Sequence, residues 1–174
     1  MTDARTLKML LQEFDGNRQI AFSLQSRDNH LQVDFQLPAD IGQTVWPAYD
    51  RLQRQDRLWE STCFELFLKD AVGPGYLEIN LSPSGGWNVY AFTGYRQDMQ
   101  VSNRLVVDSI MQETGRRLTA LLSWQGTPMT RVQLNAACIL EASTGQPAFF
   151  SIEHGTRPDF HDATCYRDAD LGTL

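Results

Sequence analysis

The segment Tyr76–Phe92, YLEINLSPSGGWNVYAF, decides the fold. Apolar side chains occupy every second position from Leu77, and the polar residues Glu78 and Asn80 lie between them. A period of two is that of an extended strand with one apolar face and one polar face. The run Pro83–Gly86 is typical of a turn, and aromatic residues suited to a second strand follow it. The segment therefore predicts two strands joined by a turn.

The residues upstream predict a partner for the first of these strands. Thr62–Leu68 is rich in aromatic and aliphatic side chains, which suit a packed sheet surface. The loop Asp70–Gly75 that follows ends in Gly-Pro-Gly, and such residues reverse the chain. We therefore expect Thr62–Leu68 and Tyr76–Leu81 to form an antiparallel hairpin.

Further extended segments, separated by Gly, Pro or polar residues, complete the pattern: Ile20–Leu24, Leu31–Leu37, Arg117–Trp124, Arg131–Leu140 and Ala148–Glu153. Regularly spaced strands without long helices between them are typical of an antiparallel sandwich or barrel. We predict an all-β domain with at least eight strands in two packed sheets. The inward side chains are expected to include Leu66, Leu77, Ile79, Leu81 and Leu121.

The two ends of the chain are less regular. Ala4–Phe14 fits either a helix or a strand, because its apolar residues alternate but the run is too short to decide. Arg167–Leu174 is interpreted as a tail.

Length and charge set further bounds. A chain of 174 residues suffices for one domain with its own core, so residues 1–174 are predicted to form a single domain. The 15 Lys and Arg against 21 Asp and Glu give a net charge of −6, which argues against nucleic acid and anionic membranes as partners. No apolar run approaches the roughly 20 residues that span a bilayer. The N-terminus lacks the pattern of a secretory signal, so we expect a cytoplasmic protein.

Two groups of residues have side chains that could form a catalytic or a metal site. The hairpin places Glu65 and Glu78 on neighbouring strands, where they could act as the acid and base of a glycosidase. The preferred interpretation is a polar sheet face whose carboxylates pair with Arg57 or Arg96 or are solvated. The chain has no GxSxG, GxGxxG or GxxxxGK[ST] motif, so we predict no enzyme activity and no catalytic residues.

The segment His154–His161 places two histidines and Asp159 close to Cys165, and such side chains can bind zinc. Their spacing matches no HExxH or CxxC motif, and the three cysteines show no CxxC pairing. We therefore interpret this segment as a surface loop with hydrogen bonds to the backbone. Structural roles are expected for the cysteines, and no metal site is predicted.

Aromatic residues indicate binding more strongly than catalysis. Trp59, Trp87, Tyr90 and Tyr95 lie within one stretch of the chain. Flat aromatic rings stack on sugar rings, and neighbouring Glu, Asn and Arg side chains can hydrogen-bond planar or hydroxyl-bearing ligands. The alternative is that most of these rings belong to the core, where tryptophan is usually found.

The segments Asp56–Leu68, Tyr76–Phe92 and Tyr95–Arg96, together with Glu153–His161, resemble the bacterial DOMON-like proteins. Those proteins are in turn similar to family 9 carbohydrate-binding modules. The resemblance covers about two thirds of the chain and implies a two-sheet, jelly-roll-like β-sandwich. The residues that match its recurring pattern are Trp59, Glu65, Glu78, Asn80, Trp87 and Arg96.

The resemblance also implies two kinds of ligand, because relatives bind sugars through aromatic clamps or haem b through a methionine and a histidine or lysine. This chain has no methionine that aligns with the axial ligand of the haem-binding relatives. Met99 is the nearest candidate, with His154 or His161 opposite it.

These inferences lead to a non-catalytic domain that binds a carbohydrate or a sugar-containing metabolite and has no cofactor. Its predicted ligand-binding residues are Trp59, Glu65, Glu78, Asn80, Trp87, Arg96, His154, Asp159 and His161. The alternatives are a haem b-binding domain, a glycoside-acting enzyme that uses Glu65 and Glu78, and a protein-interaction module. A homo-oligomer could form through unpaired sheet edges.

Overall fold

The computed structural model describes residues 4–172, which form thirteen β-strands and two single-turn 3-10 helices. In chain order they are β1 (Arg5–Glu13), β2 (Gln19–Arg27), β3 (His30–Gln36), β4 (Gln53–Arg54), η1 (Leu58–Glu60), β5 (Cys63–Asp70), β6 (Tyr76–Leu81), β7 (Gly86–Phe92), β8 (Gln100–Val101), β9 (Leu105–Glu113), β10 (Arg117–Trp124), β11 (Arg131–Leu140), β12 (Ala148–Ser151), η2 (Ala163–Cys165) and β13 (Arg167–Asp170). The all-β prediction and the hairpin of β5 and β6 are confirmed. No helix within residues 4–172 is long and apolar enough to cross a bilayer.

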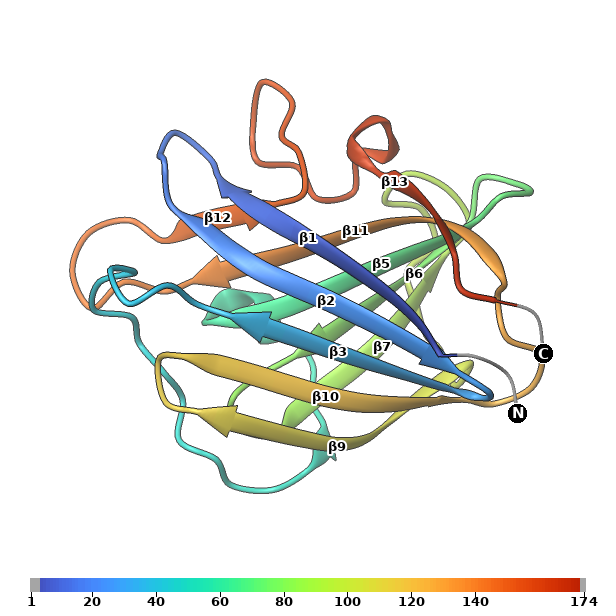
Figure 1. The fold of residues 1–174 in the computed structure, drawn as a ribbon, viewed down its shortest axis with the longest axis horizontal. Helices are drawn as coiled ribbons and strands as arrows, with labels where there is room; N and C mark the ends of the chain where they lie inside the picture. The colour runs from blue at the N-terminus through green and yellow to red at the C-terminus, as the bar shows by residue number, and fades with distance from the viewer. Residues whose placement is uncertain (1–3, 173–174) are drawn as a thin grey trace.

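The strands form two layers (Figure 1). One layer has the order β1-β2-β3-β10-β9, and the other has the order β12-β11-β5-β6-β7-β4. The pairs Gln12↔Ser151 and Glu13↔Phe150 join β1 to β12, so both layers belong to one hydrogen-bonded sheet that folds over itself. Short β13 pairs with β11, and β8 pairs with β7. The strand pairs are antiparallel except for β4 with β7.

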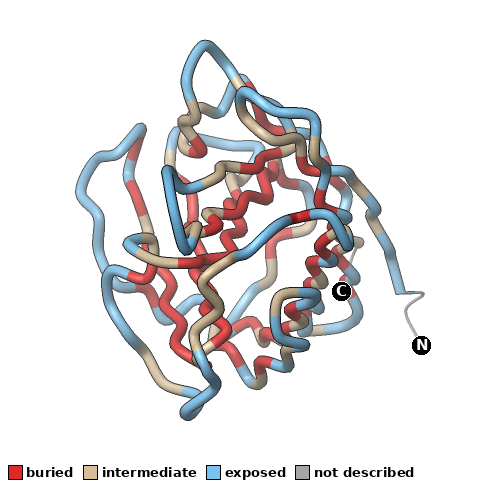
Figure 2. Tube along the Cα trace, turned by 90° about the vertical axis from the view of Figure 1, so that its left-hand side faces the viewer, coloured by how far each residue is buried: buried red, intermediate tan, exposed pale blue. Residues whose placement is uncertain are grey.

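The main core lies between the layers, and Figure 2 shows buried residues concentrated along the strands and exposed residues in the loops. The ring centroids of Phe35 on β3 and Phe64 on β5 are 5.1 Å apart, which marks the contact between layers. The inward residues predicted on β5 and β6 are all buried in this core. The prediction that Leu121 faces inward is wrong, because Leu121 is only half-buried while its β10 neighbours Ala120 and Leu122 are fully buried. Apolar residues occupy consecutive positions on β10, so the sequence does not show which of them face inward.

Strand β9 was not predicted, and a β-bulge explains why. Leu121 pairs with Ser109 but Leu122 pairs with Val107, so Asp108 is an extra residue in the ladder. The bulge shifts the inward positions from Val107 to Ile110 and interrupts the period of two.

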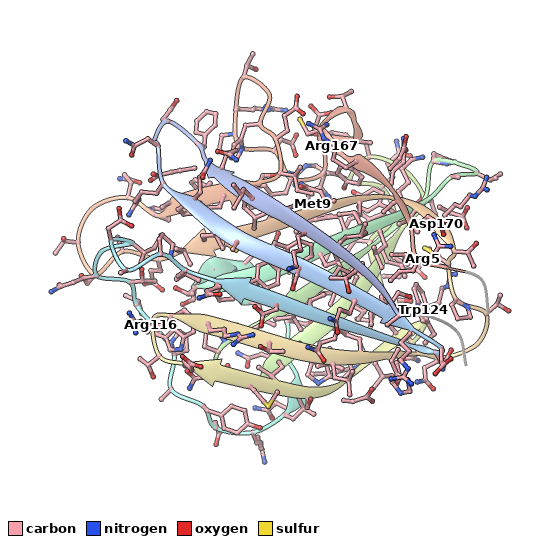
Figure 3. The ribbon with its side chains drawn as sticks, viewed as in Figure 1. Arg5, Met9, Arg116, Trp124, Arg167 and Asp170 are labelled. Atoms are coloured by element: carbon pink, nitrogen blue, oxygen red, sulfur yellow. The ribbon has the colours of Figure 1, made fainter. Side chains whose placement is uncertain are left out.

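Both ends of the described chain are strands. Ala4–Phe14 contains β1, and the predicted tail contains β13, which pairs with β11 from Arg131↔Asp170 to Leu134↔Arg167. An ion pair of 2.6 Å joins Arg5 on β1 to Asp170 on β13, and the two side chains lie at the same end of the molecule (Figure 3). The rest of the predicted tail, residues 173–174, lies outside the described residues.

The outer face of β5, β6, β7 and β11 is also covered. Residues 152–166, here called the covering segment, run from β12 to β13 and lie above β11 in Figure 1. Asn135 on β11 donates a hydrogen bond of 3.2 Å to the Phe160 carbonyl oxygen, and the Phe67 ring contacts the His161 ring. Every residue of β6 is buried, because its inner face packs in the core and its outer face lies under η1 and the covering segment. A second aromatic cluster and the candidate site lie under this segment.

Candidate ligand-binding site

A cavity of about 410 Å³ lies between the outer face of the sheet and the covering segment. Its volume is within the range of small-molecule sites. The walls combine a mostly apolar surface with four ionisable side chains. The lining residues are Trp59, Glu65, Glu78, Phe92, Arg96, Met99, Ile139, Phe149, Pro158, Phe160 and His161.

Two buried carboxyl groups line this cavity. Glu65 on β5 is 3% exposed and Glu78 on β6 is 5% exposed. The ladder pairs Glu65 with Asn80 and Phe67 with Glu78, which places both carboxyl groups on one face as diagonal neighbours. The solvated interpretation of this face is therefore wrong. Arg57 does not neutralise it, because its guanidinium pairs with Glu60.

Burial dominates the ionisation of this pair. Burial raises the pKa of Glu78 to about 7, although the hydrogen bond from Asn80 and the positive charge of Arg96 both lower this pKa. Burial also raises the pKa of Glu65 well above its ordinary value, and the neighbouring charge of Glu78 raises it further. The hydrogen bond that Glu78 accepts from Asn80 favours its ionised form, and a charge on one carboxyl group disfavours a second charge on the other.

Asn80 hydrogen-bonds one carboxyl group and is opposite the other in the ladder. Its side chain is 0% exposed, and its Nδ2 donates a hydrogen bond of 3.0 Å to Glu78 Oε1. Its Oδ1 is buried and accepts no hydrogen bond from the described residues. A buried acceptor without a donor is rare in folded proteins and requires an explanation.

His161 extends the site from the covering segment. Its Nδ1 is 2.6 Å from the Tyr76 hydroxyl oxygen, and its Nε2 is 3.6 Å from Glu78 Oε2. The ring packs edge-on against Phe92, with centroids 5.3 Å apart. Burial and the charge of Arg96 lower the pKa of His161 to about 4. His161 is therefore neutral at pH 7 and does not neutralise Glu78.

Arg96 lies at the rim and holds the covering segment to the loop after β7. Its Nη2 donates a hydrogen bond of 2.9 Å to Asp159 Oδ1, and the Tyr95 hydroxyl donates to the other carboxylate oxygen of Asp159. Burial opposes ionisation of Asp159, but these two donors outweigh it and lower its pKa. The Arg96 backbone N–H also donates to the Tyr76 hydroxyl oxygen at 3.2 Å. Arg96 thus has an anionic partner outside the cavity floor.

The structure separates the two tryptophans predicted to bind ligand. Trp59 on η1 lines the cavity, and its ring meets Tyr90 edge-on at 5.9 Å. Trp87 is 7% exposed and belongs to the core between the layers. It pairs with Leu81, so it points to the face opposite Glu78. This placement corrects the prediction that Trp87 contacts ligand beside the carboxyl groups.

The remaining predicted residues lie near the cavity without lining it. Asp159 contacts Arg96, and Asn80 contacts Glu78. His154 Nε2 is 2.8 Å from the Gln12 carbonyl oxygen, and its ring packs on Phe14, so it fixes the covering segment to the end of β1.

Several lining residues were not predicted as ligand contacts: Phe92, Met99, Ile139, Phe149, Pro158 and Phe160. Phe92 could have been predicted from the sequence. It is on the same face of β7 as Tyr90, which pairs with Glu78, so Phe92 and Glu78 lie on the same face of the sheet. Ile139 pairs with Phe149, but their place beside Glu65 depends on strand order. Strand order is not visible in local periodicity.

The haem-binding alternative does not fit the residues present. Met99 and His161 both line the cavity, as an axial pair would. However, one ring nitrogen of His161 bonds to the Tyr76 hydroxyl and the other faces the Glu78 carboxyl group. An axial histidine needs a free nitrogen that points at the iron. For a metal ion held by side chains alone, residues 4–172 contain no group of three or more His, Cys, Asp or Glu side chains.

Comparisons with known proteins bear on the fold. No family model matches the chain, and no curated protein sequence matches it. A crystal structure of a proposed carbohydrate-binding protein from Bacteroides uniformis has a TM-score of 0.63 at 9% identity and covers 94% of this chain and 84% of its own. The structure of a family 9 carbohydrate-binding module from Caldicellulosiruptor kristjanssonii in complex with cellotriose has a TM-score of 0.55 at 12% identity. The match covers 95% of this chain and 82% of that module. The chain shares the β-sandwich fold of these proteins.

Proposed function

We propose that this protein is a non-catalytic domain that binds a carbohydrate in the cavity beneath the covering segment. The observation that carries the proposal is the combination of buried hydrogen-bond acceptors with aromatic walls. Glu65 and Glu78 form the polar floor, and Trp59, Phe149 and Phe160 belong to the wall. A sugar has hydroxyl donors for the first and apolar ring faces for the second.

Two further facts support a carbohydrate. The cavity volume of about 410 Å³ suits one or two sugar residues. One protein with the same fold was solved with cellotriose, and the other is described by a carbohydrate-binding role. A likeness of fold does not transfer function by itself, so the aromatic and acidic lining of this chain carries the argument.

The absence of catalysis is part of the proposal. A glycosidase needs one protonated and one ionised carboxyl group on opposite sides of the scissile bond. Glu65 and Glu78 are diagonal neighbours on one sheet face, so they approach a ligand from the same side. Turnover of aryl glycosides by the wild-type protein, lost in Glu78→Gln, would instead support the glycoside-acting enzyme.

Isothermal titration calorimetry with mono- and disaccharides, including cellobiose, tests the proposal. We expect saturable binding that weakens at least 10-fold in Trp59→Ala, because one wall of the cavity is removed. The matched control is Tyr49→Ala, which removes a 49% exposed aromatic ring that does not line the cavity. Absence of saturable binding with every saccharide, or equal weakening in both variants, would refute the proposal.

A further inference from the structure

The charges around the cavity floor do not balance. Glu65 and Glu78 are both buried, and the groups near them that can carry a positive charge are His161 and Arg96. The Cys63 thiol lies beside Glu65, but burial raises its pKa well above the ordinary value, so it stays neutral. His161 is neutral at pH 7, and Arg96 pairs with Asp159 at the rim. Arg157, which is 76% exposed, also approaches Asp159 at 3.7 Å, where solvent screens it. An ionised carboxylate on the floor therefore has no dedicated cationic partner among the described residues.

The hydrogen bond from Asn80 indicates which carboxyl group carries the charge. Asn80 gives its amide hydrogen to Glu78 Oε1, as expected if Glu78 is the ionised acceptor. On the neighbouring strand, Glu65 is directly opposite Asn80. A protonated Glu65 would present a hydroxyl donor on the strand next to Asn80, whose Oδ1 is buried without a donor among the described residues. The pair favours at most one negative charge, and the hydrogen bond from Asn80 assigns that charge to Glu78.

We propose that the cavity selects sugars that carry a protonated amino group, with the ammonium bound at Glu78 and Glu65 acting as a neutral acid. Aromatic walls strengthen this preference, since a cation is attracted to the faces of aromatic rings. A buried carboxylate also gains more from a cation than from a hydroxyl donor. The inference rests on the proposed carbohydrate-binding function and names its ligand class.

Three β-1,4-linked disaccharides test whether the amino group, and not the rest of the sugar, determines the affinity. The probes are the glucosamine disaccharide, cellobiose and N,N′-diacetylchitobiose, which carry an amine, a hydroxyl group and a neutral amide at the same carbon. At pH 7.0 and low salt, we expect the glucosamine disaccharide to bind at least 10-fold more tightly than either of the others. Added salt should reduce this ratio, because the contact is ionic.

Two near-isosteric variants locate the charge. Glu78→Gln should bring the affinities for the glucosamine disaccharide and cellobiose within about 2-fold, because the amide has no charge. Glu65→Gln should keep the 10-fold preference, since it replaces a neutral acid by a neutral amide of similar shape and leaves the charge of Glu78 in place. The two variants together also control for damage to the floor, which would affect both disaccharides alike.

The outcomes distinguish this inference from the proposed function. Equal affinity of the wild-type protein for cellobiose and the glucosamine disaccharide would overturn the amino-sugar preference and leave carbohydrate binding intact. A preference that survives Glu78→Gln but is lost in Glu65→Gln would overturn the assignment of the charge. Failure of all three disaccharides to bind, together with failure of the wider saccharide panel, would instead refute the proposed function.

Discussion

Strands β5 and β6 bury both of their faces, but the two faces differ in chemistry. On the inner face, Leu66 and Ile79 are fully buried in the core between the layers. On the outer face, Glu65, Glu78 and Asn80 are also buried, and His161 of the covering segment lies against Glu78. Buried hydrocarbon stabilises a fold, whereas a buried carboxyl group with incomplete partners costs free energy. Equal burial thus stabilises the fold on one face and forms the candidate site on the other.

The two tryptophans give the largest expected difference between the faces. Trp87→Ala should lower the free energy of unfolding by about 3 to 5 kcal/mol, because it leaves a cavity in the core. Trp59→Ala, at the half-buried wall of the site, should cost about 1 kcal/mol. Urea unfolding of both variants provides the measurement. Similar losses of unfolding free energy from the two substitutions would contradict the expected difference between the two faces.

A smaller effect is expected from removing the charge of the outer face. The folded state raises the pKa of Glu78 to about 7, so it favours the protonated form. This contribution to stability is complete below pH 4.5 and is lost as the pH rises through 7. Glu78→Gln should therefore be more stable than the wild-type protein at pH 8, by about 1 to 3 kcal/mol. Chemical unfolding at pH 4.5 and pH 8 measures it, and a benefit confined to pH 4.5 would contradict the assignment.

His161 should show the opposite dependence on the same face. Its pKa is lowered to about 4, so the folded state favours the neutral imidazole. The stability that this provides is present above pH 6.5 and is lost as the pH falls toward 4. The imidazole resonances of His161 should titrate with a midpoint near 4 in NMR spectra of the folded protein. A midpoint near 6.5 would mean that the covering segment leaves the ring open to solvent.

Sequence patterns predicted the inner face better than the outer one. The period of two in Tyr76–Leu81 predicted which residues face the core, and the face shared by Glu65 and Glu78 followed from the hairpin. Trp87 was misplaced because its aromatic character was given more weight than its position in the alternation. The period that places Leu81 on the core also places Trp87 there.

The lining residues that the sequence did not predict are brought to the cavity by contacts between distant segments. Phe149 and Phe160 join the cavity only because β12 lies beside β11 and the covering segment returns over the sheet. No local pattern encodes either arrangement. The bulge at Asp108 likewise concealed β9, because one extra residue shifts the positions that face inward.

The attachment of the covering segment has a consequence for exchange with solvent. Both of its ends are held by β11, through Ala137↔Ser151 to Leu140↔Ala148 on one side and Arg131↔Asp170 to Leu134↔Arg167 on the other. The first ladder is reinforced because β12 also pairs with β1. The roof of the cavity should therefore open by local unfolding of β13. A bound ligand would suppress that opening, so the β13 amides should exchange deuterium more slowly even though no β13 residue lines the cavity.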